Sequence, residues 1–261
     1  MDFSDLFPDG DYRFSMGLRR RQLPEFFSAS DQQLLDERAC WLGENPDRHA
    51  AVLDGGVALL EEAAELAKTW GTPIESASNP LARCIELGRR WEPDFLLLNQ
   101  DLELQAGCVC FPSAWDFEEK MGRPLDWIHS VVPGLNAAIG PKIKALLKSL
   151  RPGFSWERAN WGLARSPELN LHPKRKLPRL DESVSLEEVW FRVERQALVA
   201  LPETNGILFG IRLEICSLAE FRKKDANRIG LRSALETMPE PMAEYKNVAT
   251  ARQQLLSFLA D

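Results

Sequence analysis

The chain has 261 residues, of which 44% are hydrophobic and 27% charged, a balance typical of a globular protein rather than of a disordered or collagen-like chain. Its 39 acidic residues exceed its 32 basic residues, so the net charge of -7 offers no general basic surface for nucleic acid. No run approaches the roughly 18 apolar residues of a membrane span, and the acidic N-terminus is unlike a secretory signal. The composition therefore predicts neither a nucleic-acid partner nor a membrane location.

The cysteines indicate a reducing compartment. There are five, an odd number, and most lie far apart in the sequence. Such a set is unlike the disulfide framework of a secreted protein and lacks the ligands of an iron–sulfur cluster. We expect a cytoplasmic protein in which Cys108 and Cys110 are small core residues. Glycine-rich phosphate-binding motifs are also absent from the sequence.

Residues 1–92 carry helical periodicity and predict an N-terminal helical region packed on the core. Ser30 and Gln33 form a capping-box pattern, and Asn79 followed by Pro80 is a common start of a helix. Apolar residues recur at a 3.6-residue spacing between these signals. The helices expected here cover residues 31–42, 57–67 and 79–91.

From residue 93 the pattern changes to short strand-like runs separated by turn residues. The Asn205-Gly206 step is a hairpin signal between the last two runs. The expected strands cover residues 95–99, 107–111, 156–164, 190–201 and 207–215. The expected helices cover residues 124–130 and 137–150, between the second and third strands, and residues 218–224, 228–238 and 250–259 at the end.

This order of elements predicts an α+β fold. A five-stranded antiparallel sheet with helices inserted between its second and third strands has the connectivity of the PAS fold, whose helices and sheet enclose a ligand. We expect residues 93–216 to form this PAS-like core and residues 217–261 to add C-terminal helices. No linker or internal repeat separates the parts, so we expect one structural unit.

Three histidines are the first candidates for a ligand-binding role. His49 and His172 lie in polar stretches and are expected to be solvated. His129 lies among apolar residues of the inserted helices. It is either a core histidine that bonds a backbone carbonyl or an axial ligand of a haem iron in a dry pocket.

The run 190–198 places charges in the middle of an apolar strand. Arg192, Glu194 and Gln196 share one face, while Arg195 lies on the other. Two interpretations are open: an edge strand with solvated Arg–Glu pairs, or a polar wall for a ligand, to which Arg158 and Arg212 would add. Buried charges must pair with each other or with that ligand.

Several ordered motifs across residues 95–260 together resemble the haem-dependent oxidative N-demethylase alpha-subunit family. The resemblance implies a haem b domain with a PAS-like fold and a haem pocket. Such a domain uses dioxygen to oxidise a small secondary amine, such as dimethylamine, to a primary amine and formaldehyde. Electrons would come from reductase partners that carry FMN and a [2Fe-2S] cluster. The motifs are Phe111-Pro-Ser-Ala-Trp115, Glu119-Lys-Met-Gly-Arg-Pro-Leu125, Ile128-His129-x-x-Val132-Pro133-Gly134, Arg158-Ala-Asn-Trp161, Arg192-Val-Glu-Arg-Gln196, Leu201-Pro202, Phe209-x-Ile-Arg212 and Tyr245-Lys246.

The resemblance also implies roles for single residues. His129 matches the histidine of the family's Ile-His motif and is expected to be the axial iron ligand. Glu194 is expected to hold the amine cation or deliver protons, and it forms the predicted catalytic set with Arg192 and Arg158. The predicted cofactor-binding set is His129, Trp161, Arg195 and Arg212, with the arginines facing haem propionates or dioxygen.

Two other functions remain open at this stage. A haem-based gas or redox sensor with a PAS-like fold would bind the same cofactor without catalysis. A binding module for a small molecule other than haem would leave the charged strand as a surface ladder. Absorbance in the Soret region separates the haem functions from the latter.

Overall fold

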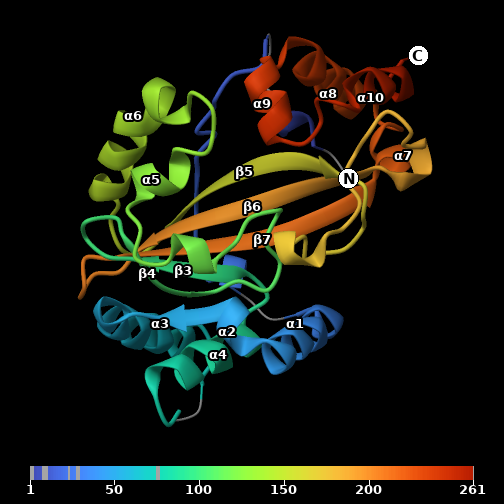
Figure 1. Cartoon of the computed structure of the whole chain (residues 1–261). Helices are drawn as coiled ribbons and strands as arrows, with labels where there is room; N and C mark the ends of the chain where they lie inside the picture. Colours follow the sequence, from blue (N-terminus) through green and yellow to red (C-terminus); the bar gives the residue numbers. More distant parts are fainter. Residues whose placement is uncertain (1–2, 8–10, 23, 28–29, 75–76, 261) are drawn as a thin grey trace.

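The computed structural model describes residues 3–7, 11–22, 24–27, 30–74 and 77–260. Within them, a seven-stranded antiparallel sheet runs in the order β1-β5-β6-β7-β3-β4-β2 (Figure 1). The α+β class is therefore confirmed. The strands are β1 (Arg19–Arg21), β2 (Ala50–Val52), β3 (Asp94–Leu98), β4 (Leu104–Cys108), β5 (Ser155–Ala164), β6 (Trp190–Ala200) and β7 (Ile207–Ser217).

The expected count of five strands is wrong, because the described residues add β1 at one edge of the sheet and β2 at the opposite edge. Both come from the region predicted as helical. Each has three residues, which is too short to show the alternation that distinguishes a strand in sequence. The hairpin of β6 and β7 closes as predicted, with Asn205 at a φ of 55° and the Leu201 amide donating to Gly206 O over 2.9 Å.

Four helices precede β3 in the sequence and pack below the sheet in Figure 1: α1 (Gln32–Glu44), α2 (Pro46–His49), α3 (Val57–Thr69) and α4 (Pro80–Arg90). The cap predicted at Ser30 is displaced by one residue, because Asp31 accepts from the Leu34 amide while Ser30 binds Glu92. Asn79 caps α4 as predicted, accepting from the Ala82 amide over 2.9 Å.

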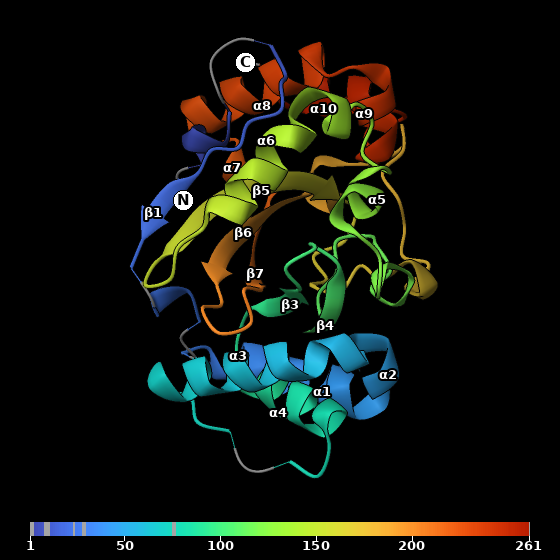
Figure 2. The same cartoon turned by 90° about the vertical axis from the view of Figure 1, so that its left-hand side faces the viewer.

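The remaining helices cover other parts of the sheet. The inserted pair, α5 (Leu125–His129) and α6 (Leu135–Ser149), lies between β4 and β5 in the chain, as predicted. At the C-terminus, α7 (Leu218–Phe221), α8 (Asp225–Thr237), α9 (Glu240–Tyr245) and α10 (Arg252–Phe258) gather beyond one end of the sheet (Figure 2). Short 3-10 helices are η1 (Ser4–Leu6), η2 (Glu25–Phe27), η3 (Asp54–Gly56), η4 (Glu118–Lys120), η5 (Pro173–Arg175) and η6 (Leu186–Glu188).

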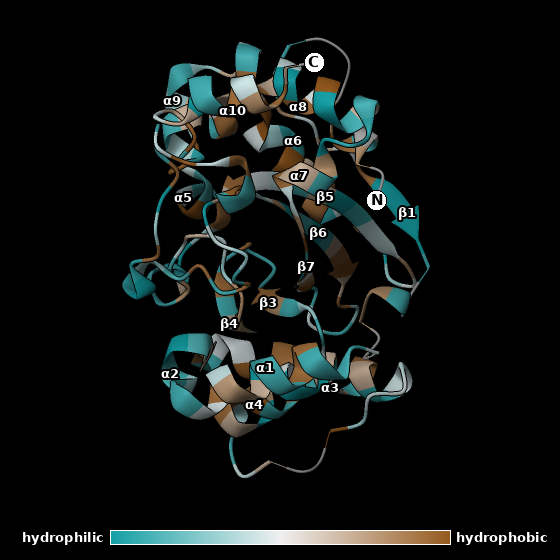
Figure 3. Cartoon of the chain, turned by 90° about the vertical axis from the view of Figure 1, so that its right-hand side faces the viewer, coloured by the Kyte–Doolittle hydropathy of each residue, from teal (hydrophilic) through white to brown (hydrophobic). Residues whose placement is uncertain are grey.

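Three apolar clusters join these layers, and the helices alternate hydrophobic and hydrophilic residues accordingly (Figure 3). The first cluster packs α1, α3 and α4 on Phe95 and Ala197. The second packs the C-terminal helices on Phe191 and Val193. The third packs α5 and α6 on Leu198 and its neighbours. Since Val193 and Ala197 alternate with Leu198 along β6, the inserted helices cover the opposite face of the sheet.

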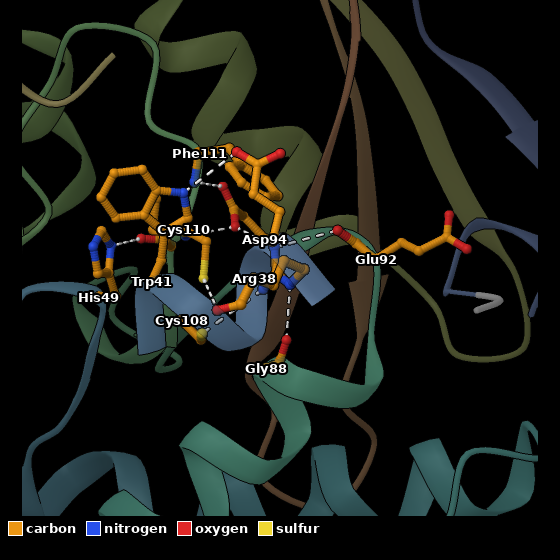
Figure 4. A network of polar contacts seen from close by, with 11 residues as sticks. Arg38, Trp41, His49, Gly88, Glu92, Asp94, Cys108, Cys110 and Phe111 are labelled. Carbon is orange, nitrogen blue, oxygen red and sulfur yellow. Dashed lines mark hydrogen bonds and ion pairs between the residues drawn. The ribbon is translucent and has the colours of Figure 1, made fainter. Parts of the chain in front are cut away.

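A buried polar network fixes the N-terminal helices to β3 and β4 (Figure 4). The fully buried Arg38 of α1 donates to Gly88 O over 2.8 Å and to Asp94 Oδ1 over 2.6 Å. Asp94 also accepts from the amides of Cys110 and Phe111. Burial opposes the charged form of Arg38, but the neighbouring Cys110 and Asp94 raise its pKa above the ordinary value, so the guanidinium stays charged.

Candidate functional site

One face of β5 and β6 carries most of the polar residues predicted for the site. The register pairs Arg158 with Gln196 and Asn160 with Glu194, and it places Arg192 opposite Gly162. Directly paired residues lie on the same face of a sheet, and residues two apart return to it. We call Arg158, Asn160, Arg192, Glu194 and Gln196 the β5–β6 polar face. Since β6 lies between β5 and β7, the interpretation of this run as an edge strand is wrong.

His129 lies beside the same face. It ends α5, which packs on the sheet through Leu125 and Ile128 in the cluster that contains Leu198. Its ring is half-buried, and burial, followed by the charges of Arg158 and Lys120, lowers its pKa to about 4. The imidazole is therefore neutral at physiological pH, the form in which a ring nitrogen coordinates a metal.

Three cations at or beside this face bind only neutral acceptors. Arg192 donates to Glu168 O and Leu169 O over 2.6 and 2.8 Å, and Lys246 donates to Trp161 O over 2.6 Å. Arg158 reaches only Ser15 O, at 3.5 Å, and its Nε and that of Arg192 are buried without a partner among the described residues. By contrast, Arg38, Arg165, Arg195 and Arg212 all pair with carboxylates.

Burial shifts the pKa values of all three cations. Burial lowers the pKa of Arg192 to about 10 and that of Lys246 to about 8, and it lowers the pKa of Arg158 as well. In all three cases Glu194 is the carboxylate that opposes the shift. Arg192 is buried, Arg158 and Lys246 are half-buried, and Glu194 is the carboxylate of the described residues that acts on all three, so this face carries an excess of positive charge.

The same face leaves room for a ligand at Gly162. A Cβ added to this glycine would meet no atom within 4 Å, whereas one added to Gly107 or Gly210 elsewhere in the sheet would meet atoms at 2.6 and 2.8 Å. Gly162 lies directly opposite Arg192 in the register. The open space at Gly162 therefore lies next to the guanidinium of Arg192, which has no carboxylate partner among the described residues.

The structure places the other predicted cofactor-binding residues on the opposite face. Arg195 and Arg212 pair across β6 and β7, and Trp161 packs among Phe7 and Phe191. Arg195 binds Glu214, and Arg212 binds Glu92 and Phe26 O. The two arginines line a surface hollow of about 540 Å³ together with Asp5, Arg19, Arg21, Phe26, Glu157 and Glu214. This hollow is separated by the sheet from His129 and Glu194.

The expectation that the other two histidines are solvated is wrong. His49 is 1% exposed and its Nδ1 bonds Val109 O over 2.8 Å. His172 is 2% exposed, and its Nδ1 accepts from the Lys174 amide. His49 ends α2 and His172 caps η5, both in stretches that appear polar in sequence, and each has a backbone partner that sequence does not reveal. Burial lowers the pKa of both rings.

Sequence reasoning assigned no role to Lys246, Lys120 or Asn160, which the structure adds to this region. Lys246 follows α9 and reaches the exposed edge of β5, 85 residues earlier, where its ammonium also lies 4.8 Å from the Trp161 ring. Lys120 of η4 acts on His129 through its charge. The Tyr245-Lys246 pair was visible as a motif, but its position beside β5 depends on how the C-terminal helices pack.

The described part of the chain lacks two features. It holds no group of three or more His, Cys, Asp or Glu side chains arranged for a metal ion. No helix there has the length and apolar character needed to cross a bilayer. A haem iron can be held by one protein ligand and the four nitrogens of its own ring, so haem binding does not require such a group of side chains.

The fold and this face define an α+β protein with a cation-lined sheet surface beside a neutral histidine. A comparison with protein families gives a match over residues 57–256 to the family described as haem-dependent oxidative N-demethylase, alpha subunit-like. The chain belongs to this family, and the resemblance predicted from its motifs is confirmed.

Proposed function

We propose that the chain binds haem b between α5 and the β5–β6 polar face, with His129 as the axial ligand. We further propose that it uses dioxygen to demethylate a small secondary amine such as dimethylamine. The observation that carries the proposal is the set of three cations without carboxylate partners beside a neutral, half-buried histidine. Membership of a family named for haem-dependent N-demethylation supports it.

The cations fit the two propionates of haem. Arginine recognises carboxylates through paired N–H groups, and Arg158 and Arg192 both have a buried Nε with no acceptor among the described residues. Binding two carboxylates would offset the cost of burying these charges. The open space at Gly162 gives the cofactor room beside Arg192.

The longer strands also support a PAS-like arrangement of this pocket. Without the three-residue edge strands, the sheet order is β5-β6-β7-β3-β4, with α5 and α6 inserted between β4 and β5. The helices that supply His129 thus cover the sheet face that supplies Arg158 and Glu194, as the PAS-like hypothesis requires.

In the proposed reaction, haem supplies the activation of dioxygen. One oxygen atom enters a C–H bond of the N-methyl group and the other leaves as water, with two electrons and two protons consumed. The resulting carbinolamine breaks its C–N bond to release formaldehyde and a primary amine. The alpha-subunit-like family name supports the expectation that electrons come from partner subunits. We propose, as the motif resemblance implies, that these partners carry FMN and a [2Fe-2S] cluster.

The chain's own residues would position the amine and exclude water. Glu194 accepts a hydrogen bond from Gln196 through Oε2, which leaves Oε1 for the ammonium of the substrate. Arg192 is 3% exposed, and its contacts with the loop at residues 168–169 close that end of the face. A dry site strengthens the attraction between Glu194 and a cation.

The test is a His129→Gly variant of the haem-loaded protein. We expect the variant to lose or shift the Soret band and to regain it with added imidazole, which fills the space of the missing ring. A His49→Gln variant is the matched control and should keep the wild-type spectrum. A normal band in His129→Gly, or its loss in His49→Gln alone, would assign the ligand elsewhere. Formaldehyde formed per dioxygen consumed, with an electron-donating system supplied, then tests turnover.

A further inference from the structure

Glu194 and Lys246 form a pair of opposite charges that the structure holds apart. The ammonium of Lys246 donates to Trp161 O over 2.6 Å and lies 3.5 Å from Asn160 Oδ1. The carboxylate of Glu194 accepts from Gln196 over 2.9 Å. The charge of Glu194 partly opposes the lowering of the Lys246 pKa, yet the described residues show no ion pair between the two.

Each group retains hydrogen-bonding capacity. An ammonium has three N–H donors, and Lys246 uses at most two on the described residues. A carboxylate has two oxygens, and the described residues bond only Oε2 of Glu194. The neutral partners Asn160 and Gln196 belong to the β5–β6 polar face and hold the charged ends in place.

The number of cations on this face also indicates that Lys246 is available to a second anion. Arg158, Arg192 and Lys246 bind neutral acceptors, and the two propionates of haem would neutralise two of these three cations. The two arginines carry the orphaned Nε groups and have the geometry for propionates. Lys246 is then the cation left for a further anion, and it lies next to the carboxylate proposed to hold the amine.

We infer that the substrate is a zwitterion, a secondary amine that carries a carboxylate, such as an N-methyl amino acid. Its ammonium bonds Glu194 and its carboxylate bonds Lys246. This inference rests on the proposed function for the position of the methyl group, and it narrows the substrate from any small amine to one with an acid group. A simple dialkylamine would bond Glu194 and leave Lys246 without its anion.

The experiment compares ligands that differ in one charge. Binding of N-methylglycine, its methyl ester and dimethylamine to the wild-type protein is measured by isothermal titration calorimetry, with and without haem. Soret difference spectra on the haem-loaded protein give a second readout. We expect N-methylglycine to bind at least tenfold more tightly than the ester or dimethylamine.

Two variants assign the charges. Lys246→Gln keeps a hydrogen-bond donor and removes the charge, and we expect it to weaken N-methylglycine at least tenfold while dimethylamine changes less than twofold. Glu194→Gln should weaken both. The exposed pair Lys223 and Glu220 supplies the controls Lys223→Gln and Glu220→Gln, which should leave every affinity unchanged.

The outcomes separate this inference from the proposed function. If dimethylamine or the ester binds as tightly as N-methylglycine, the inference of a zwitterionic substrate is wrong, even where the haem spectrum is normal. If no Soret band forms under haem-replete conditions, the proposed function fails, and calorimetry without haem still decides whether Glu194 and Lys246 bind the zwitterion. The ligand series uses only wild-type protein, so the result does not depend on the stability of either variant.

Discussion

Replacing Arg38 by Met should destabilise the protein more than any exposed charge change. The side chain is fully buried and donates to Gly88 O, Glu92 O and Asp94 Oδ1, at 2.8, 3.3 and 2.6 Å. The variant leaves the Asp94 carboxylate buried with two backbone donors and strands two carbonyls. Removing one partner of a buried ion pair typically costs about 3–5 kcal/mol. That is a large part of the roughly 5–15 kcal/mol by which domains are stable.

Urea unfolding followed by circular dichroism measures the loss, and two further variants make the result interpretable. Arg90→Met removes an exposed pair with Glu86 and should cost less than about 0.5 kcal/mol. Arg38→Lys keeps the charge without the forked geometry and should fall between the two, so the comparison survives if Arg38→Met does not fold. A loss of less than about 1 kcal/mol in a folded Arg38→Met protein would refute the reasoning.

Three other predictions concern acid stability, close packing and cofactor space. Burial opposes the charged form of Glu92, but the amides of Ser30 and Asp31 and the charge of Arg212 lower its pKa. Its contribution to the free energy of unfolding is therefore present above about pH 4.5 and is lost on acidification. Glu92→Gln should flatten the fall of the melting temperature below that pH, and an unchanged profile would contradict this. Gly56→Ala would place a Cβ 2.4 Å from the backbone oxygen of Gln105 and should lower the melting temperature, whereas Gly43→Ala meets nothing within 4 Å and should not; equal melting temperatures would count against the packing. Gly162→Leu should fill the open space on the β5–β6 polar face and weaken haem binding, measured by haem titration, with the fold retained; undiminished affinity would place the cofactor elsewhere.

The sequence predicted those helices, turns and strands that are determined by interactions between residues close together in the chain. The Asn79-Pro80 start of α4, the Asn205-Gly206 turn and the long strands β5 to β7 follow from capping, turn and alternation preferences. The three-residue strands β1 and β2 carry no such signal, because pairing with β5 and β4 defines them. Five strands were therefore expected where the described residues form seven.

For the candidate site, too, the local pattern predicted some features, and the packing of distant segments decided the others. Alternation correctly placed Arg192 and Glu194 on one face and Arg195 on the other. Which face lies beside His129 depends on the packing of α5, and the approach of Lys246 to β5 depends on the C-terminal helices. These are contacts between segments far apart in the sequence, and the local pattern of apolar residues does not predict such contacts. The burial of His49 and His172 was missed because it depends on tertiary packing, in which Nδ1 of each ring bonds a backbone group.

In the proposed site, this chain holds haem through His129 beside a face of cations that have no carboxylate partner among the described residues. Its most direct test is the visible spectrum of the wild-type protein purified after expression with added haem precursor, recorded in the ferric and reduced states and during titration with a secondary amine. We expect a Soret band at one haem per chain that shifts as the amine binds. Protein without a Soret band under these conditions would contradict it.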